Sequence, residues 1–119
     1  MARIALFGDV HGNVLALDAV RVAIKAARPD AIMIAGDLVL NGPDPAATID
    51  GIRELEADGA LVVAGNTDIA VADFDYTAAF PWLTESVPDT VRFAAEWAHA
   101  AIGPERVAGS RTSFLSTMP

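Results

Sequence analysis

Hydrophobic positions in the first 65 residues of the chain follow two different spacings. Short apolar runs at 3–7, 31–35 and 60–64 are bounded by glycine and aspartate, a pattern typical of strands buried on both faces of a parallel sheet. Between these runs, apolar residues recur every three or four positions, as in helices with one side in the core. The order of the segments predicts a βαβαβ unit, an α/β fold in which right-handed crossovers place three strands in one parallel sheet.

Two helices are predicted between the strands. Asn13 can cap the first, which spans 13–28 because Pro29 prevents its continuation. The second begins at Asp44, an N-cap followed by proline, and ends near Gly59. The residues expected to face the core share the helical spacing: Leu17, Val20, Ile24, Ala27, Ile49, Ile52 and Leu55.

The pattern weakens after Asn66. Residues 73–88 are rich in aromatic residues and proline, which indicates a loop or a short helix. A helix is predicted over 89–102, and its polar stripe places His99 at the solvated surface, away from any metal. Residues 103–119 are expected to form a linker and one last short helix. The apolar side of the 89–102 helix is expected to carry Val91, Ala94, Ala98 and Ala101.

Composition narrows the class of protein. A chain of 119 residues is long enough for one domain, and its formal charge of -8 argues against binding to a nucleic-acid backbone. The absence of cysteine excludes disulfides, thiolate metal sites and cysteine nucleophiles, and it fits a reducing cytoplasm. No apolar run approaches the ~18 residues of a membrane span, and the first residues lack the pattern of a signal peptide. We therefore expect a cytoplasmic protein that has no membrane partner.

Polar residues follow each predicted strand directly. Asp9 and His11 follow the first strand, Asp37 follows the second, and Asn66 and Asp68 follow the third. A single aspartate in such a place is usually a turn or capping residue. Three strand ends meet at one edge of a parallel sheet, however, and carboxylates gathered there repel one another unless a cation lies between them. The set therefore favours a divalent metal site, with nitrogen and oxygen ligands suited to Mn, Fe, Zn or a similar ion.

Three motifs occur in order along the chain: D-V-H-G-N at 9–13, G-D-L-V-L-N-G-P-D-P at 36–45 and G-N-T-D at 65–68. Together they resemble the D-x-H, G-D and G-N-H-[DE] signatures of the calcineurin-like metallophosphoesterase superfamily. The G-P-x-P extension and the residue other than histidine in the third motif are most similar to its small prokaryotic phosphodiesterase branch. The resemblance implies that the chain forms the N-terminal half of a four-layered α/β sandwich with two facing sheets.

The resemblance also implies an activity and its residues. The activity is hydrolysis of phosphodiester or phosphomonoester bonds in a small substrate by a metal-activated hydroxide, with two divalent ions as cofactors. Asp9 and His11 would bind one ion, Asp37 would bridge both, and Asn66 would bind the second. Asp68 would support these ligands without touching a metal, so that Asp37, Asn66 and Asp68 form the implied catalytic group. Manganese is among the metals expected.

Two features depart from the family pattern. Thr67 stands where many members carry a histidine, and threonine is no general acid near neutral pH. The family also supplies further ligand histidines from a second half-sheet, whereas this sequence has two histidines in all. We therefore expect residues 1–119 to be one domain that stops before the second half-sheet, is at most weakly active alone, and forms a homo-oligomer or pairs with a missing C-terminal half.

Three alternative classes of protein make different demands on the sequence. A response-regulator receiver needs a lysine after its last strand, but Lys25, the only lysine, lies in a predicted helix. A dinucleotide-binding domain needs G-x-G-x-x-G after a strand, which is absent. A catalytically incomplete scaffold, which acts through an exposed apolar sheet face, remains open as the alternative function.

Overall fold

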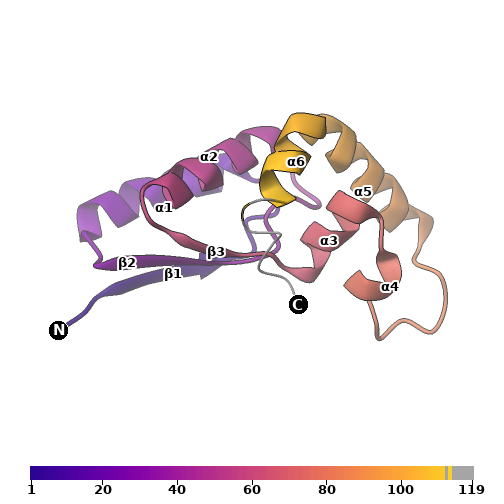
Figure 1. Ribbon diagram of the computed structural model, residues 1–119, viewed down its shortest axis with the longest axis horizontal. Helices are drawn as coiled ribbons and strands as arrows, with labels where there is room; N and C mark the ends of the chain where they lie inside the picture. Colours follow the sequence, from indigo (N-terminus) through magenta and orange to yellow (C-terminus); the bar gives the residue numbers. More distant parts are fainter. Residues whose placement is uncertain (112, 114–119) are drawn as a thin grey trace.

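The computed structural model describes residues 1–111 and 113, and within them it contains one sheet followed by a group of helices (Figure 1). The elements in chain order are β1 (Ile4–Gly8), α1 (Val14–Ala27), β2 (Ala31–Ala35), α2 (Pro45–Ala57), β3 (Leu61–Val63), α3 (Asn66–Asp73), α4 (Tyr76–Ala79), α5 (Asp89–Ile102) and α6 (Pro104–Arg111). No helix in this part of the chain has the length and apolar character needed to cross a membrane.

The sheet has the predicted parallel topology, with β2 in the centre and β1 and β3 on either side. Its register pairs Phe7 with Ile34 and Ile34 with Val62. The βαβαβ prediction is thus confirmed, and each strand lies within one residue of its predicted bounds. Asn13 caps α1 through its side chain, and Asp44 caps α2 in the same way, so the helix starts are also as predicted.

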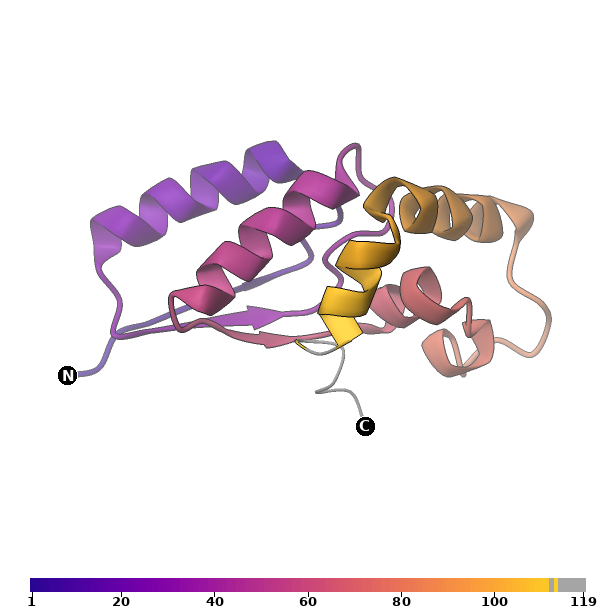
Figure 2. The same cartoon turned by 45° about the horizontal axis from the view of Figure 1, so that its top comes forward.

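Helices α1 and α2 lie side by side along one face of the sheet (Figures 1 and 2). Their inner side chains, including Leu17 of α1 and Ile52 of α2, are completely buried with Ile34 of β2. Gly51 permits the close approach of the two helices, because a Cβ there would lie 2.8 Å from a methyl carbon of Leu17. This layer of helix on sheet is the hydrophobic core that fixes the strand ends.

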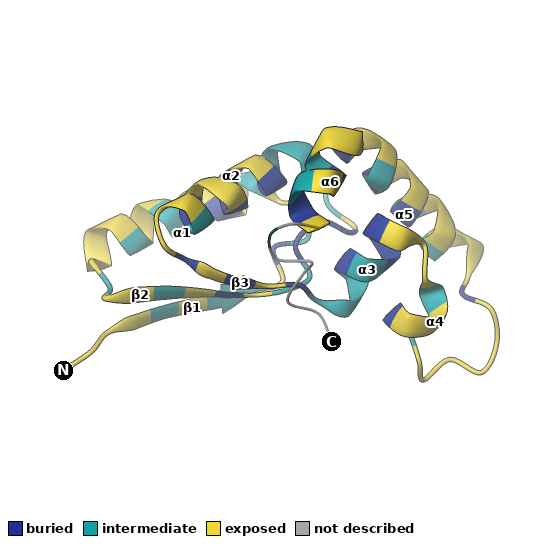
Figure 3. Cartoon of the chain, viewed as in Figure 1, coloured by how far each residue is buried: buried dark blue, intermediate teal, exposed yellow. Residues whose placement is uncertain are grey.

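The other face of the sheet is exposed (Figure 3). Leu6, Met33 and Leu61 occupy neighbouring positions across the three strands, and their exposed fractions are 68%, 38% and 54%. The expectation that the strands are buried on both faces is therefore wrong for the described residues. The reason lies in the strand order: when right-handed crossovers advance in one direction across a sheet, every connecting helix falls on the same face.

The helices after β3 form a second group beside the edge of the sheet (Figure 2). α5 occupies the predicted range, but its buried residues are Ala95, Ala98 and Ile102, whereas Ala101, expected inside, is exposed. Helix α3 has no apolar stripe and was not predicted. α6 falls within the tail where a short helix is expected, and the remainder of that prediction lies outside the described residues.

Candidate metal centre

Three of the residues singled out in the sequence meet at the carboxyl edge of the sheet. Asp9, His11 and Asp37 each offer one ligand atom, and these atoms all lie within 4.8 Å of one another. Asp9 is exposed, whereas His11 and Asp37 are half-buried. The strand ends therefore gather this part of the ligand set as the sequence predicts.

Backbone hydrogen bonds hold the loops after β1 and β2 against each other. The N–H groups of Asp9 and His11 donate to the carbonyl oxygens of Gly36 and Asp37, each at 3.0 Å. Gly12 extends the series by donating to Leu38 at 2.7 Å. The two loops thus continue the parallel pairing of their strands for several residues, and this pairing places the side chains of Asp9, His11 and Asp37 together.

All three cluster residues adopt left-handed backbone conformations. The φ angles are 55° at Asp9, 49° at His11 and 60° at Asp37. Such conformations are uncommon outside glycine, cost of order 1–3 kcal/mol when the surroundings impose them, and concentrate at functional sites. Aspartate and histidine are among the residues other than glycine that adopt this conformation most often, so the backbone at each position is compatible with a ligand-type side chain.

The ring of His11 is oriented by a backbone carbonyl. Its Nδ1 lies 2.8 Å from the oxygen of Leu40, which can only accept, so Nδ1 carries the hydrogen and Nε2 of the neutral ring keeps a lone pair. That Nε2 lies 3.6 Å from Oδ1 of Asp9. Two acceptors that face each other in this way are stabilised by a proton or a cation between them. A histidine held by a carbonyl on its other nitrogen is also the usual arrangement of a metal ligand.

Asp37 receives two hydrogen bonds from Thr67, the residue that stands in place of the family's histidine. The backbone N–H and the hydroxyl of Thr67 both reach Oδ1 of Asp37, at 3.1 and 2.6 Å. No feature of the sequence reveals this contact, since it joins loops that lie 30 positions apart.

Asp68 fastens the second and third motifs together. Its Oδ2 accepts from the N–H groups of Asp37 and Gly65 at 2.9 and 2.8 Å, and its Oδ1 accepts from Leu38 at 2.8 Å. The side chain is 2% exposed. Burial, with a smaller contribution from the charge of Asp37, raises the pKa of Asp68 to about 6 despite these hydrogen bonds. Its hydrogen bonds all go to backbone, which fits the supporting part that the family resemblance implies.

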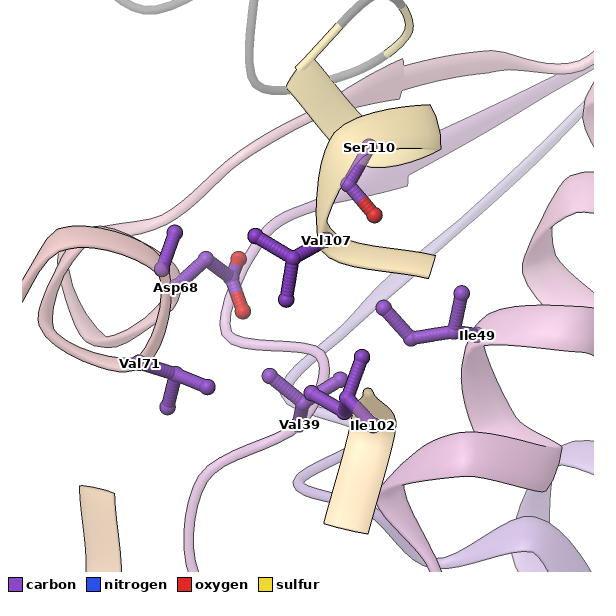
Figure 4. Close-up of a pocket in the computed structure, with 8 residues that line it drawn as sticks. Val39, Ile49, Asp68, Val71, Ile102, Val107 and Ser110 are labelled. Carbon is purple, nitrogen blue, oxygen red and sulfur yellow. The ribbon is translucent and has the colours of Figure 1, made fainter. Parts of the chain in front are cut away.

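The helices that follow shield Asp68 from bulk solvent. A cavity of about 20 Å³ lies beside its carboxylate, lined mainly by apolar side chains of α2, α3, α5 and α6 (Figure 4). Val107 and Ser110 of α6 are both buried there. The cavity has room for about one water molecule and none for a substrate. It is a packing space behind the cluster, and its low polarity accounts for the raised pKa of Asp68.

Asn66, predicted as a ligand of the second metal, is the first residue of α3. Its side-chain Nδ2 donates to the carbonyl of Ala79 in α4 at 3.0 Å, which fixes the orientation of the amide. Its neighbours in the chain, Gly65 and Thr67, both approach Asp37. The backbone of the third motif therefore lies against the cluster, and the role of the Asn66 oxygen as a ligand stays a prediction.

His99 lies outside the cluster. The interpretation that it is a solvated surface residue is wrong, because it is half-buried, its Nδ1 is 2.7 Å from the oxygen of Val71, and its ring packs 4.7 Å from that of Phe74. α5 is rotated relative to the predicted orientation so that this side turns toward α3. The histidine therefore ties α5 to α3.

Gly36 and Gly65, which precede Asp37 and Asn66, allow the loops after β2 and β3 to pack closely. A Cβ on Gly36 would lie 2.0 Å from the nitrogen of Gly65, and a Cβ on Gly65 would lie 2.3 Å from Oδ1 of Asp37. The space that glycine leaves at these positions is thus filled by the protein itself.

Comparison with known proteins identifies the class to which this arrangement belongs. The chain belongs to the calcineurin-like phosphoesterase family, whose model matches residues 2–109. The crystal structure of a metallophosphoesterase from Sphaerobacter thermophilus is similar, with a TM-score of 0.67 and 28% identity over 94% of this chain. A hypothetical protein from Pyrococcus horikoshii shares the fold, with a TM-score of 0.77 and 24% identity over 93% of the chain. None of the curated proteins matches.

The chain spans less than half of these structural relatives. It covers 41% of the Sphaerobacter protein and 47% of the Pyrococcus protein. The α/β fold is shared with both.

Proposed function

We propose that this chain provides the first part of the active site of a metal-dependent phosphoesterase, which hydrolyses phosphodiester or phosphomonoester bonds of a small substrate. The observation that carries the proposal is the convergence of Asp9, His11 and Asp37 within 4.8 Å on strained, hydrogen-bonded loops. Two divalent ions, with manganese among the metals that we propose, would suit a nitrogen and oxygen donor set of this kind. The absence of cysteine suits a reducing cytoplasm, where we propose that the activity takes place.

Each residue of the cluster has a separate proposed role. His11 presents Nε2 because Leu40 holds its Nδ1, and Asp9 presents an exposed carboxylate beside it. Asp37, held by Thr67, is the residue that we propose to bridge the two ions, with Asn66 as a ligand of the second. Bound divalent ions supply an activated water nucleophile and stabilise the charge that develops on the phosphate oxygens. Asp68 keeps the second and third motifs in place by accepting their backbone hydrogens.

The residues near the cluster also bear on the substrate. As a metal ligand through Nε2, His11 would carry its one ring hydrogen on Nδ1, where it is donated to Leu40, and the Thr67 hydroxyl donates its hydrogen to Asp37. Neither group is then placed to protonate a departing alkoxide. We therefore propose that esters with acidic leaving groups are the better substrates.

The test is hydrolysis of p-nitrophenyl phosphate and bis(p-nitrophenyl) phosphate by the 119-residue chain with Mn²⁺, with Mn²⁺ plus EDTA, and with Asp37→Asn. Weak turnover that requires Mn²⁺ and is lost in Asp37→Asn supports the proposal. Hydrolysis that EDTA does not affect would refute metal dependence. Asp75→Asn, a change at the exposed N-cap of α4, is the matched control and is expected to retain activity.

A second candidate function is favoured by the exposed face of the sheet. Leu6 and Leu61 are more than half exposed, which is unusual for side chains of a sheet and is typical of an interaction surface. The chain would then be a catalytically incomplete scaffold that binds through this face. Mn²⁺ binding without turnover of either ester, together with self-association, would favour the scaffold over the enzyme.

A further inference from the structure

The contact between Thr67 and Asp37 is the strongest feature that the motifs do not explain. The hydroxyl oxygen of Thr67 lies 2.6 Å from Oδ1 of Asp37, the length of a charge-assisted hydrogen bond. The backbone N–H of the same residue reaches the same oxygen at 3.1 Å. Oδ1 therefore receives two donors from one residue, and Oδ2 receives neither of them.

The direction of the hydroxyl bond follows from the chemistry of its partner. An ionised carboxylate only accepts hydrogen bonds, so the hydrogen of Thr67 Oγ1 points at Asp37. The hydroxyl thus donates its only hydrogen to the carboxylate and has none to donate to a substrate oxygen. Its remaining capacity is to accept, which adds nothing to the binding of an anionic phosphate.

Two further contacts restrict the same aspartate. Its backbone N–H donates to Asp68 at 2.9 Å, and its φ of 60° is imposed by the loop. With the main chain fixed in this way, the remaining freedom of the residue is rotation of its side chain, and the two bonds from Thr67 oppose that rotation. A freely rotating carboxylate loses conformational entropy when it binds a cation, whereas a carboxylate already fixed loses less.

We propose that Thr67 is a positioning residue for the metal site: its hydroxyl holds the Asp37 carboxylate in the orientation that binds the cation. The inference deepens the proposed function, on which it rests. It assigns a specific task to the position at which the motif lacks histidine. The third motif thus supplies an orienting group for the metal ligand of the second motif.

The test compares Mn²⁺ affinity in Thr67→Val and Thr67→Ser, measured by the loss of the free Mn²⁺ signal in electron paramagnetic resonance. Valine keeps the shape and the N–H but removes the hydroxyl, and the dissociation constant is expected to rise about 10-fold, the effect of removing a group that orients a ligand. Serine restores the hydroxyl and is expected to bind within about twofold of the wild type.

Thr48→Val is the matched control. Thr48 is buried, whereas Thr67 is half-buried. The Thr48 hydroxyl donates to the carbonyl of Asp44 at 2.8 Å, so its loss removes a hydroxyl hydrogen bond that does not touch Asp37. Its Mn²⁺ affinity is expected to equal that of the wild type. If Thr67→Val binds as tightly as the wild type, or if serine fails to rescue, the inference is overturned. If the wild type itself does not bind Mn²⁺, the proposed metal site fails, which is a distinguishable result.

Discussion

The Nδ1 atom of His11 lies 2.8 Å from the carbonyl oxygen of Leu40, 29 positions further along the chain. This contact leaves Nε2 as the ring nitrogen that can bind a cation, because a carbonyl oxygen only accepts hydrogen bonds and Nδ1 must therefore be the donor. The loop that supplies the carbonyl runs from β2 into the core, where Leu38, Val39 and Leu40 are all buried. The chemistry of the histidine is therefore set by the packing of a loop that belongs to a different motif.

Replacement of Asp37 by asparagine should weaken metal binding strongly without unfolding the chain. Asparagine tolerates the left-handed backbone at this position, and its oxygen can still accept from Thr67, but the negative charge is lost. We expect the Mn²⁺ dissociation constant to rise by about 100-fold or more, as for the loss of a charged ligand, while the thermal midpoint stays close to that of the wild type. Calorimetric titration and circular dichroism measure the two quantities, and an unchanged affinity would remove Asp37 from the site.

Asp68→Ala should destabilise the fold. The change leaves the N–H groups of Asp37, Leu38 and Gly65 without their acceptor in a buried region. We expect a loss of about 3 kcal/mol in the free energy of unfolding by urea. The comparison variant is Asp44→Ala, which removes the single capping bond of α2 and should cost about 1 kcal/mol. Equal losses in the two variants would contradict the fastening role of Asp68.

Arg28→Gly should stabilise the protein. Arg28 ends α1 with a φ of 50° and precedes Pro29, a place where glycine is the preferred residue. Relief of the left-handed strain, less the backbone entropy that glycine adds to the unfolded chain, should raise the free energy of unfolding by about 0.5–1 kcal/mol. Arg28→Ala removes the same side chain without relieving the strain and should give no gain. A gain from alanine equal to that from glycine would show that the side chain, not the backbone, is responsible.

The ion pair between Asp50 and Arg106 should make stability depend on acid pH. The two hydrogen bonds from the Arg106 guanidinium, at 2.9 and 3.0 Å, hold the pKa of Asp50 below its usual range. Because the pKa is lower in the folded state, the pair stabilises the fold above the unfolded pKa, and this contribution disappears as the pH falls through the folded value. The difference in thermal midpoint between the wild type and Asp50→Asn should therefore shrink from pH 7 to pH 3. Both side chains are substantially exposed, so the whole difference is small and should also fall with added salt.

The exposed face of the sheet is expected to drive self-association. Leu6→Lys places a charge on that face, where 68% of the leucine is exposed, and should lower the average mass measured by light scattering. The matched change is Leu15→Lys on α1, where the leucine is 79% exposed but lies away from the sheet, and it should leave the mass unchanged. A wild-type chain that is monomeric at all concentrations would contradict the expectation.

The sequence predicts the parts of the fold that depend on local spacing. The strands and the starts of α1 and α2 follow from apolar runs and from the caps Asn13 and Asp44. The exposed sheet face could not be predicted, because a run such as 31–35 is equally apolar whether one face or both faces are covered. Helix α3 lacks an apolar stripe, and Gly65 at its N-cap has no side chain that could cap it. The one local sign of its start is Asp68, whose carboxylate accepts from the N–H of Gly65.

The convergence of the three candidate ligands could be predicted as far as it depends on strand order. Three strand ends bring Asp9, His11 and Asp37 together, and the parallel topology alone places them at one edge. The contacts that orient these residues are not visible in the sequence, because Leu40 acts through its carbonyl and Thr67 through a hydrogen bond across 30 positions. His99 was misplaced because an error of one or two positions in the buried face of a helix moves a residue from solvent to a helix contact.

The central position of β2 has a consequence for the tolerance of the chain to deletions. Loss of one residue within 31–35 would shift every later side chain of the strand to the opposite face, so that Ile34 would leave the core for solvent. The same deletion would draw Asp37 about 3.3 Å along the strand axis, out of line with His11. Length changes in this strand should therefore damage the core and the cluster together. The turn at 58–60 between α2 and β3 lies at the opposite end of the sheet from the cluster, so length changes there should leave the cluster in place.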